Sequence, residues 1–216
     1  MFRNIYKLMF GLLLMFAFFN SNILNAQTTT MSFNSKITDL QPQAKIVYPL
    51  FSISPLFGIQ FPVANLNNTY KSSFVGGLDI NMKVNRETSF FLNASYYDMP
   101  IKTDLQGPGA AVISITVGPR YTFTSNAVRA AFFLEAGLGV YMFHTQDYTY
   151  PNYINGQQVT IASATTTNFG VNVGPGVIIP LGGAADLLLK VKLHDILASG
   201  GSSTFVAGVV GVDFRL

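Results

Sequence analysis

The residues in this chain best suited to general-base chemistry are its two histidines, and the chain has no cysteine. Each histidine has an acid and a serine nearby in sequence: His144 with Asp147 and Ser163, and His194 with Asp195 and Ser199. A serine, a base and an orienting acid form the nucleophilic triad of many hydrolases. Both sets fall at or beside expected loops, where histidines are commonly incidental. We therefore predict no catalytic residue, no metal site and no cofactor.

A second set of chemically active residues is charged and lies at alternate positions of segments that are otherwise apolar and small. We predict that these side chains line the interior of a narrow barrel, where charges must pair or meet water. They are interpreted as a structural ion-pair network, and the alternative is a gated path for ions. The ten predicted lumen residues are Asp79, Lys83, Arg120, Arg129, Glu135, Asp186, Lys190, Lys192, Asp213 and Arg215.

The expected height of these charges along the strands differs. We place Asp79, Glu135, Lys190 and Lys192 near the middle of the barrel and the other six toward its periplasmic end. A carboxylate surrounded by a wall of low dielectric constant needs a cationic partner to remain ionised. We therefore predict that Glu135 pairs with at least one of Arg120, Lys190 and Lys192.

Tyrosines mark the segment between His144 and Thr166. Tyr148, Tyr150 and Tyr153 offer the rigid amphipathic contact area that binding surfaces favour. The alternative is that they belong to an aromatic girdle at the membrane surface or extend a hairpin.

The elements that position these residues are strands, because apolar residues recur at every second position. Leu134 and Leu138, for example, alternate with Glu135 and Gly137. We expect the apolar face to meet lipid and the polar face to meet the lumen. The eight predicted strands are 50–61, 74–85, 89–97, 111–123, 128–143, 167–179, 185–196 and 204–216.

The predicted links alternate between long and short. Long links follow the first, third and fifth strands, short links follow the second, fourth and sixth, and the link 197–203 is short in a position where a long one is expected. Outer-membrane barrels have an even number of strands, short periplasmic turns and longer external loops. We therefore predict an eight-stranded antiparallel up-and-down transmembrane β-barrel with both termini in the periplasm. Gly118-Pro119 and Gly174-Pro175-Gly176 are interpreted as β-bulges.

The composition also favours a membrane barrel. Hydrophobic residues make up 49% of the 216 residues and charged residues only 11%, against about 25% charged in soluble domains. A soluble barrel, with its apolar face inward, is the structural alternative. Of the 13 basic residues, Arg3 and Lys7 lie in the leader, so the rest nearly balance the 10 acidic ones. No basic block is present, so we expect no binding to nucleic acids.

The N-terminus has the pattern of a signal peptide. Arg3 and Lys7 precede the apolar stretch 8–19, and a polar segment then ends at Ala26. We predict cleavage after Ala26; the alternative is an uncleaved anchor, although the apolar stretch is short for spanning a membrane. The predicted organisation is a signal peptide over 1–26, a periplasmic lead-in over 27–47 and a barrel over 48–216.

Several short motifs resemble small outer-membrane β-barrel domain proteins typical of Bacteroidetes, along nearly the whole chain after the leader. The segments that carry the resemblance are 54–58 (SPLFG), 70–71 (YK), 94–97 (ASYY), 117–121 (VGPRY) and 212–216 (VDFRL). The resemblance implies an outer-membrane location, contact with lipid and lipopolysaccharide, and assembly by the barrel-insertion machinery. It implies no reaction.

These observations predict a non-enzymatic outer-membrane barrel with a filled lumen. It is expected to act through its external loops or as a subunit of an outer-membrane assembly with a protein partner. A narrow channel for ions or small solutes is the alternative function. A lipid-modifying enzyme ranks third, because neither histidine segment matches the small barrels that deacylate or palmitoylate lipid A at their rim.

Overall fold

The computed structural model describes residues 48–123, 130–151, 157–198 and 201–216. The predicted signal peptide and periplasmic lead-in lie outside the described residues, as do Arg129, Tyr153 and Ser199. The boundary predicted at residue 48 therefore stays a prediction.

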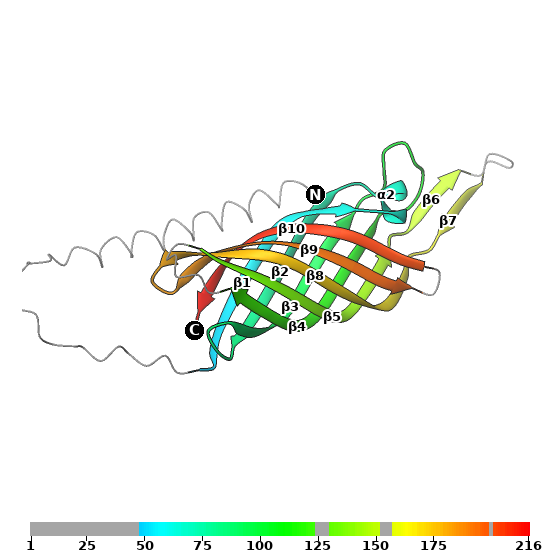
Figure 1. Cartoon of the computed structure of the whole chain (residues 1–216). Helices are drawn as coiled ribbons and strands as arrows, with labels where there is room; N and C mark the ends of the chain where they lie inside the picture. The colour runs from blue at the N-terminus through cyan, green and yellow to red at the C-terminus, as the bar shows by residue number, and fades with distance from the viewer. Residues whose placement is uncertain (1–47, 124–129, 152–156, 199–200) are drawn as a thin grey trace, which may run out of the picture. The chain divides into compact units, whose positions relative to one another are not determined.

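Eight antiparallel strands close into one barrel, as predicted (Figure 1). Around the barrel, each strand is hydrogen-bonded to the next in the order β1-β10-β9-β8-β5-β4-β3-β2. The bounds are β1 Leu50–Pro62, β2 Ser73–Lys83, β3 Thr88–Met99, β4 Ala110–Phe123, β5 Ala131–Thr145, β8 Ala164–Gly182, β9 Ala185–Ala198 and β10 Gly201–Arg215. A short helix and a hairpin lie in the links: α2 Asn65–Thr69, β6 Tyr148–Pro151 and β7 Gln158–Ile161.

The two ends of the barrel differ in their links. At one end, here called the turn end, the links are short, and β1 begins and β10 ends there. The other end, here called the loop end, carries the links 63–72, 100–109 and 146–163 and the short link 199–200. Within the described residues no helix combines the length and apolarity needed to cross a membrane. The alternation of link lengths agrees with the prediction.

The two faces of the wall have opposite polarity. Leu134 faces outward with 46% of its surface exposed, whereas Glu135, the next residue, faces the lumen and is 1% exposed. The same alternation holds along β9, where Leu193 is 43% exposed and Lys192 is 3% exposed. A soluble barrel would bury its apolar face, so that alternative is wrong. The lipid-facing wall and polar lumen match a membrane barrel.

The strands are staggered around the barrel. If paired residues are followed once around the wall from Asp195, the path returns to the same strand at Ala185, ten residues nearer the turn end. This offset is the shear of the barrel, and together with the number of strands it determines the strand tilt and the barrel diameter. The path visits Val171, Leu138, Val117, Leu92, Ile80, Ile53 and Phe214 in turn.

The bulges predicted at the Gly-Pro segments are wrong. In β4 and β5, Val117 pairs with Leu138 and Arg120 pairs with Glu135, so the register is the same on both sides of Pro119. Instead of a bulge, the neighbouring strand comes so close that a Cβ added to Gly118 would overlap the backbone carbonyl oxygen of Ala136. Glycine at position 118 allows this close approach, and Pro119 removes one N–H donor without shifting the register.

The segment around Pro175 in β8 behaves in the same way. Its register with β9 is unchanged from Val173 to Gly176. At Gly176 the aromatic ring of Phe133 covers the backbone, and an added Cβ would overlap that ring. A shift does occur at the end of β8, between Pro180 and Gly182. Glycines thus make room for large lumen side chains in a narrow barrel.

Candidate functional site

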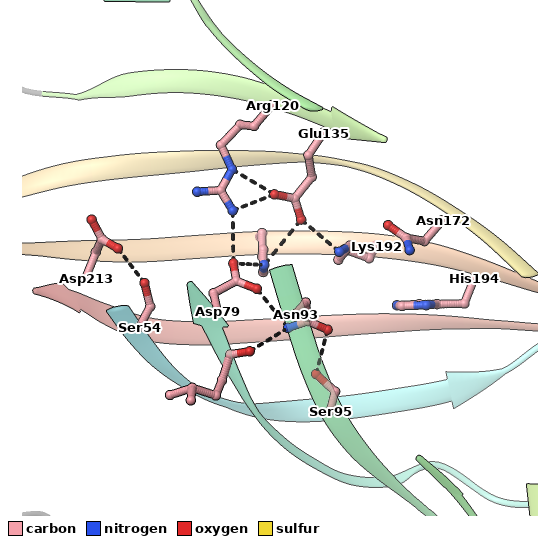
Figure 2. A network of polar contacts seen from close by, with 12 residues as sticks. Ser54, Asp79, Asn93, Ser95, Arg120, Glu135, Asn172, Lys192, His194 and Asp213 are labelled. Carbon is pink, nitrogen blue, oxygen red and sulfur yellow. Dashed lines mark hydrogen bonds and ion pairs between the residues drawn. The ribbon is translucent and has the colours of Figure 1, made fainter. Parts of the chain in front are cut away.

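The lumen holds a compact group of five charged side chains, here called the charged layer: Asp79, Arg120, Glu135, Lys190 and Lys192 (Figure 2). They come from β2, β4, β5 and β9, and each occupies a position whose side chain points into the barrel. Arg120 and Glu135 are directly paired across β4 and β5. Strand alternation and register together bring the five charges to one height.

The contacts within the charged layer are shared rather than paired one to one. Arg120 donates from Nε to Oε2 of Glu135 at 2.8 Å and from Nη2 to Oδ2 of Asp79 at 2.9 Å. Lys190 contacts both carboxylates, and its Nζ lies 3.2 Å from Oε1 of Glu135. Lys192 Nζ lies 3.0 Å from the same oxygen. Glu135 therefore contacts all three predicted partners, and its predicted pairing is confirmed.

The surroundings of the charged layer compensate for its burial. All five side chains are at most 4% exposed, and three cations face two carboxylates. The guanidinium of Arg120 lies 4.5 Å from the ring centre of Phe133, and Lys192 Nζ lies 4.4 Å from that of Phe91. Such cation–π contacts stabilise the additional positive charge.

Further polar contacts lie at and beside the charged layer. On one side, Asn93 donates to Asp79 at 2.8 Å and accepts from Ser95 at 2.9 Å. Toward the turn end, Ser54 donates to Asp213. These contacts are drawn in Figure 2, and the one between Ser54 on β1 and Asp213 on β10 joins strands distant in sequence.

The predicted lumen residues thus separate into two groups. Arg120 was expected toward the periplasmic end, but it lies in the charged layer because its strand register places it opposite Glu135. The second group lies at the turn end, where Arg215 pairs with Asp186 at 2.8 Å and is itself half exposed. Lys83 lies near that pair, half buried. The role of either group remains a proposal.

Above the charged layer, toward the loop end, lies an aromatic layer around His194. Its imidazole is fully buried; Nδ1 lies 2.9 Å from the hydroxyl of Tyr141, and Nε2 lies 3.3 Å from that of Tyr97. Phe205 stacks on the ring at 4.6 Å. Asp195 lies on the opposite face of β9. The rim triad considered for His194 is therefore wrong, because β9 carries the imidazole into the lumen.

The other histidine segment forms no triad either. His144 lies exposed at the loop end, and its Nδ1 contacts the hydroxyl of Thr165 at 2.9 Å. The carboxylate of Asp147 accepts a hydrogen bond from the backbone N–H of Ser163. This acid therefore holds the backbone of the link and does not orient the imidazole of His144. Among the described residues, no three acids or histidines are grouped as metal ligands.

The mouth of the barrel is closed by an apolar cluster, here called the mouth plug: Leu66, Tyr70, Val75, Met99, Ala110, Val112, Ile196 and Phe143. The link 63–72 folds over the mouth, and α2 inserts Leu66. Backbone hydrogen bonds hold the link 63–72 to the link 100–109; the N–H of Lys102 donates to the carbonyl of Thr69 at 2.9 Å. Burial raises the pKa of the Tyr70 hydroxyl. The sequence analysis treated this link only as a loop. The spacing of Leu66 and Tyr70, four residues apart, is the signal that could have indicated a helical turn with an apolar face.

A hairpin extends from the loop end beyond the barrel (Figure 1). Strands β6 and β7 form their own two-stranded sheet, in which Tyr148 pairs with Ile161 and Tyr150 with Val159. The rings of Tyr148 and Tyr150 stack at 5.9 Å. Two of the three predicted tyrosines thus share one face of the hairpin.

Comparison with solved structures shows which known folds this barrel resembles. The structure resembles Neisserial surface protein A, with 14% identity, a TM-score of 0.57, and coverage of 77% of this chain and 97% of that one. It also resembles a major outer membrane protein from Thermus thermophilus, with 13% identity, a TM-score of 0.54, and coverage of 77% and 99%. No family model and no curated protein matches the sequence.

The fold is that of an outer-membrane β-barrel. The closed eight-stranded barrel and its apolar outer wall agree with these structural similarities. The likeness concerns the fold alone, and the Bacteroidetes resemblance stays a prediction.

Proposed function

We propose that this chain is an integral outer-membrane protein with a closed lumen that acts at the cell surface through its loop end. Both termini lie on the periplasmic side, and the role is recognition or assembly rather than transport or catalysis. The observation that carries the proposal is the packing of side chains across the lumen at three successive levels, in the charged layer, the aromatic layer and the mouth plug.

The filling argues against the narrow channel. A permeating ion would have to part the contacts of Glu135 with three cations and then displace Leu66 and Met99. Desolvating an ion past an apolar plug is costly. A filled lumen is also the ordinary state of eight-stranded barrels.

The loop end offers the contact surface. The described parts of the β6–β7 hairpin contain no charged residue, and Tyr148 and Tyr150 form one stacked pair on it. Tyrosine supplies large contact area at low conformational-entropy cost. Lipopolysaccharide or a second outer-membrane protein is the proposed partner of this surface.

Conductance of the reconstituted full-length barrel in a planar lipid bilayer tests the closed lumen. We expect no single-channel steps for the wild type, and none for Leu66→Ala alone, because the aromatic layer and the charged layer still fill the lumen. Discrete steps in the wild-type protein would support the channel instead.

Surface labelling tests the orientation. An epitope inserted between Pro151 and Gln157 should react with antibody on intact cells, and an epitope after Leu216 should react only after lysis. Heat-modifiable migration should disappear when the barrel-insertion machinery is depleted. The reverse labelling pattern would refute the orientation, and an altered lipid A mass on expression would restore the enzyme hypothesis.

A further inference from the structure

Asp195 is a carboxylate on the lipid-facing wall whose neighbours along its own strand are apolar. Asp195 on β9 points outward between Leu193 and Leu197, which are 43% and 57% exposed. Its Oδ1 accepts a hydrogen bond from the Thr204 hydroxyl at 2.8 Å. No cation of the described residues forms an ion pair with it. Charged residues on a lipid-facing wall are destabilising and mark functional sites.

Asp195 lies at one end of a groove in the outer wall. The groove has a volume of about 490 Å³ and crosses β4, β5, β8 and β9. The floor of the groove is recessed below the neighbouring side chains, because Pro119 and Ala136 are small. The strands also approach each other closely at Gly118. The sides are apolar and include Val117, Leu138, Val171, Val173 and Leu193.

The stagger of the strands sets the slope of the groove. The row of paired residues that begins at Asp195 continues through Val171 and Leu138 to Val117. This row descends toward the turn end, because a full circle returns ten residues lower, at Ala185. Asp195 is therefore the loop-side end of the groove, and the apolar part runs from it toward the middle of the wall.

We propose that this groove binds one lipid whose headgroup carries a primary ammonium. The acyl chain lies along the apolar floor, and the ammonium donates to the carboxylate of Asp195. The charge of Asp195 selects the occupant, because an ammonium forms a charge-assisted hydrogen bond with it. A second copy of this chain suits the groove less well. A two-fold contact would present the same lining from both copies, and that lining contains no cation to compensate Asp195. The site is independent of the function proposed above.

Headgroup selectivity tests the proposal. The purified full-length barrel is mixed in detergent with equal amounts of phosphatidylethanolamine and phosphatidylglycerol of the same acyl chains, and retained lipid is counted by native mass spectrometry. We expect one retained lipid with about a tenfold preference for phosphatidylethanolamine, the usual effect of one charge-assisted hydrogen bond. Asp195→Asn should abolish the preference. Asp98→Asn, a matched outward residue on β3 that accepts from Ser73, should retain it.

Blocking the groove provides a second measurement that does not depend on the carboxylate. Ala136→Phe fills the floor from outside and should release the lipid, whereas Ala94→Phe, at an exposed position of β3, should not. Heat-modifiable migration verifies folding of each variant. Equal retention of both lipids by the wild type, an unchanged preference in Asp195→Asn, retention in folded Ala136→Phe, or a cross-linked dimer through the groove would each overturn the proposal.

Discussion

The charged layer lies about midway along the lumen and the mouth plug lies at its loop end, and their side chains are of opposite kinds. In the charged layer, Glu135 contacts three cations, so each member depends on the others. In the mouth plug, Leu66 and Met99 contribute apolar burial separately. Losing one carboxylate leaves three buried cations facing a single negative charge, whereas losing one apolar side chain leaves only a cavity. The charged layer should therefore be the more sensitive of the two.

The largest expected effect comes from Glu135→Gln. This change removes the carboxylate shared by Arg120, Lys190 and Lys192 and should lower the free energy of unfolding by ~3–5 kcal/mol. Urea unfolding in lipid vesicles, followed by heat-modifiable migration, measures the loss. A loss no larger than that of a plug variant would break the comparison.

Double variants sharpen the same comparison. Lys192 contacts Glu135 but not Asp79, whereas Lys190 contacts both carboxylates. Adding Lys192→Met to Glu135→Gln should therefore restore more of the lost stability than adding Lys190→Met. Equal restoration by both would show that the charges act as an undivided set.

The outer wall gives the next largest effect. Leu134 is adjacent to Glu135 but faces lipid, and Leu134→Arg should cost ~2–4 kcal/mol near the bilayer midplane. Leu134→Phe serves as the control and should be nearly neutral in the same unfolding assay. If Leu134→Arg assembles as well as the wild type, the inside–outside assignment of β5 is wrong.

Leu66→Ala measures the mouth plug alone. Leucine-to-alanine changes in cores cost ~2–5 kcal/mol, and we expect about 2 kcal/mol here because the link 63–72 can collapse onto the space. The unfolding midpoint should fall while the slope of the transition stays constant. A loss equal to that of Glu135→Gln would contradict the proposed difference between the two regions.

The smallest effect is expected in the aromatic layer between them. Tyr141→Phe keeps the ring but removes the hydroxyl that contacts His194 at 2.9 Å and Asn172 at 3.4 Å. The expected loss is ~0.5–1.5 kcal/mol. Tyr97→Phe should cost less, because its contact with His194 is longer, 3.3 Å. A reversed order in unfolding measurements would contradict this ranking.

The barrel itself was predictable from the sequence. Side chains alternate across a strand as a matter of local backbone geometry, so the period-two pattern was sufficient to place Leu134 outside and Glu135 inside. The same pattern predicted eight strands, and the alternating link lengths predicted their up-and-down order. The N-terminal leader pattern is likewise a property of the sequence, although the structure does not describe it.

Tertiary structure decided which side chains meet. Alternation determines the face of a residue but not its height or its neighbours across the lumen, which depend on register and on the stagger of the closed barrel. For that reason Arg120 was misplaced, and His194 was interpreted as a rim residue instead of the centre of an aromatic layer. The same limit hid Leu66 in the mouth plug and the groove that ends at Asp195, because each joins segments that are distant in sequence.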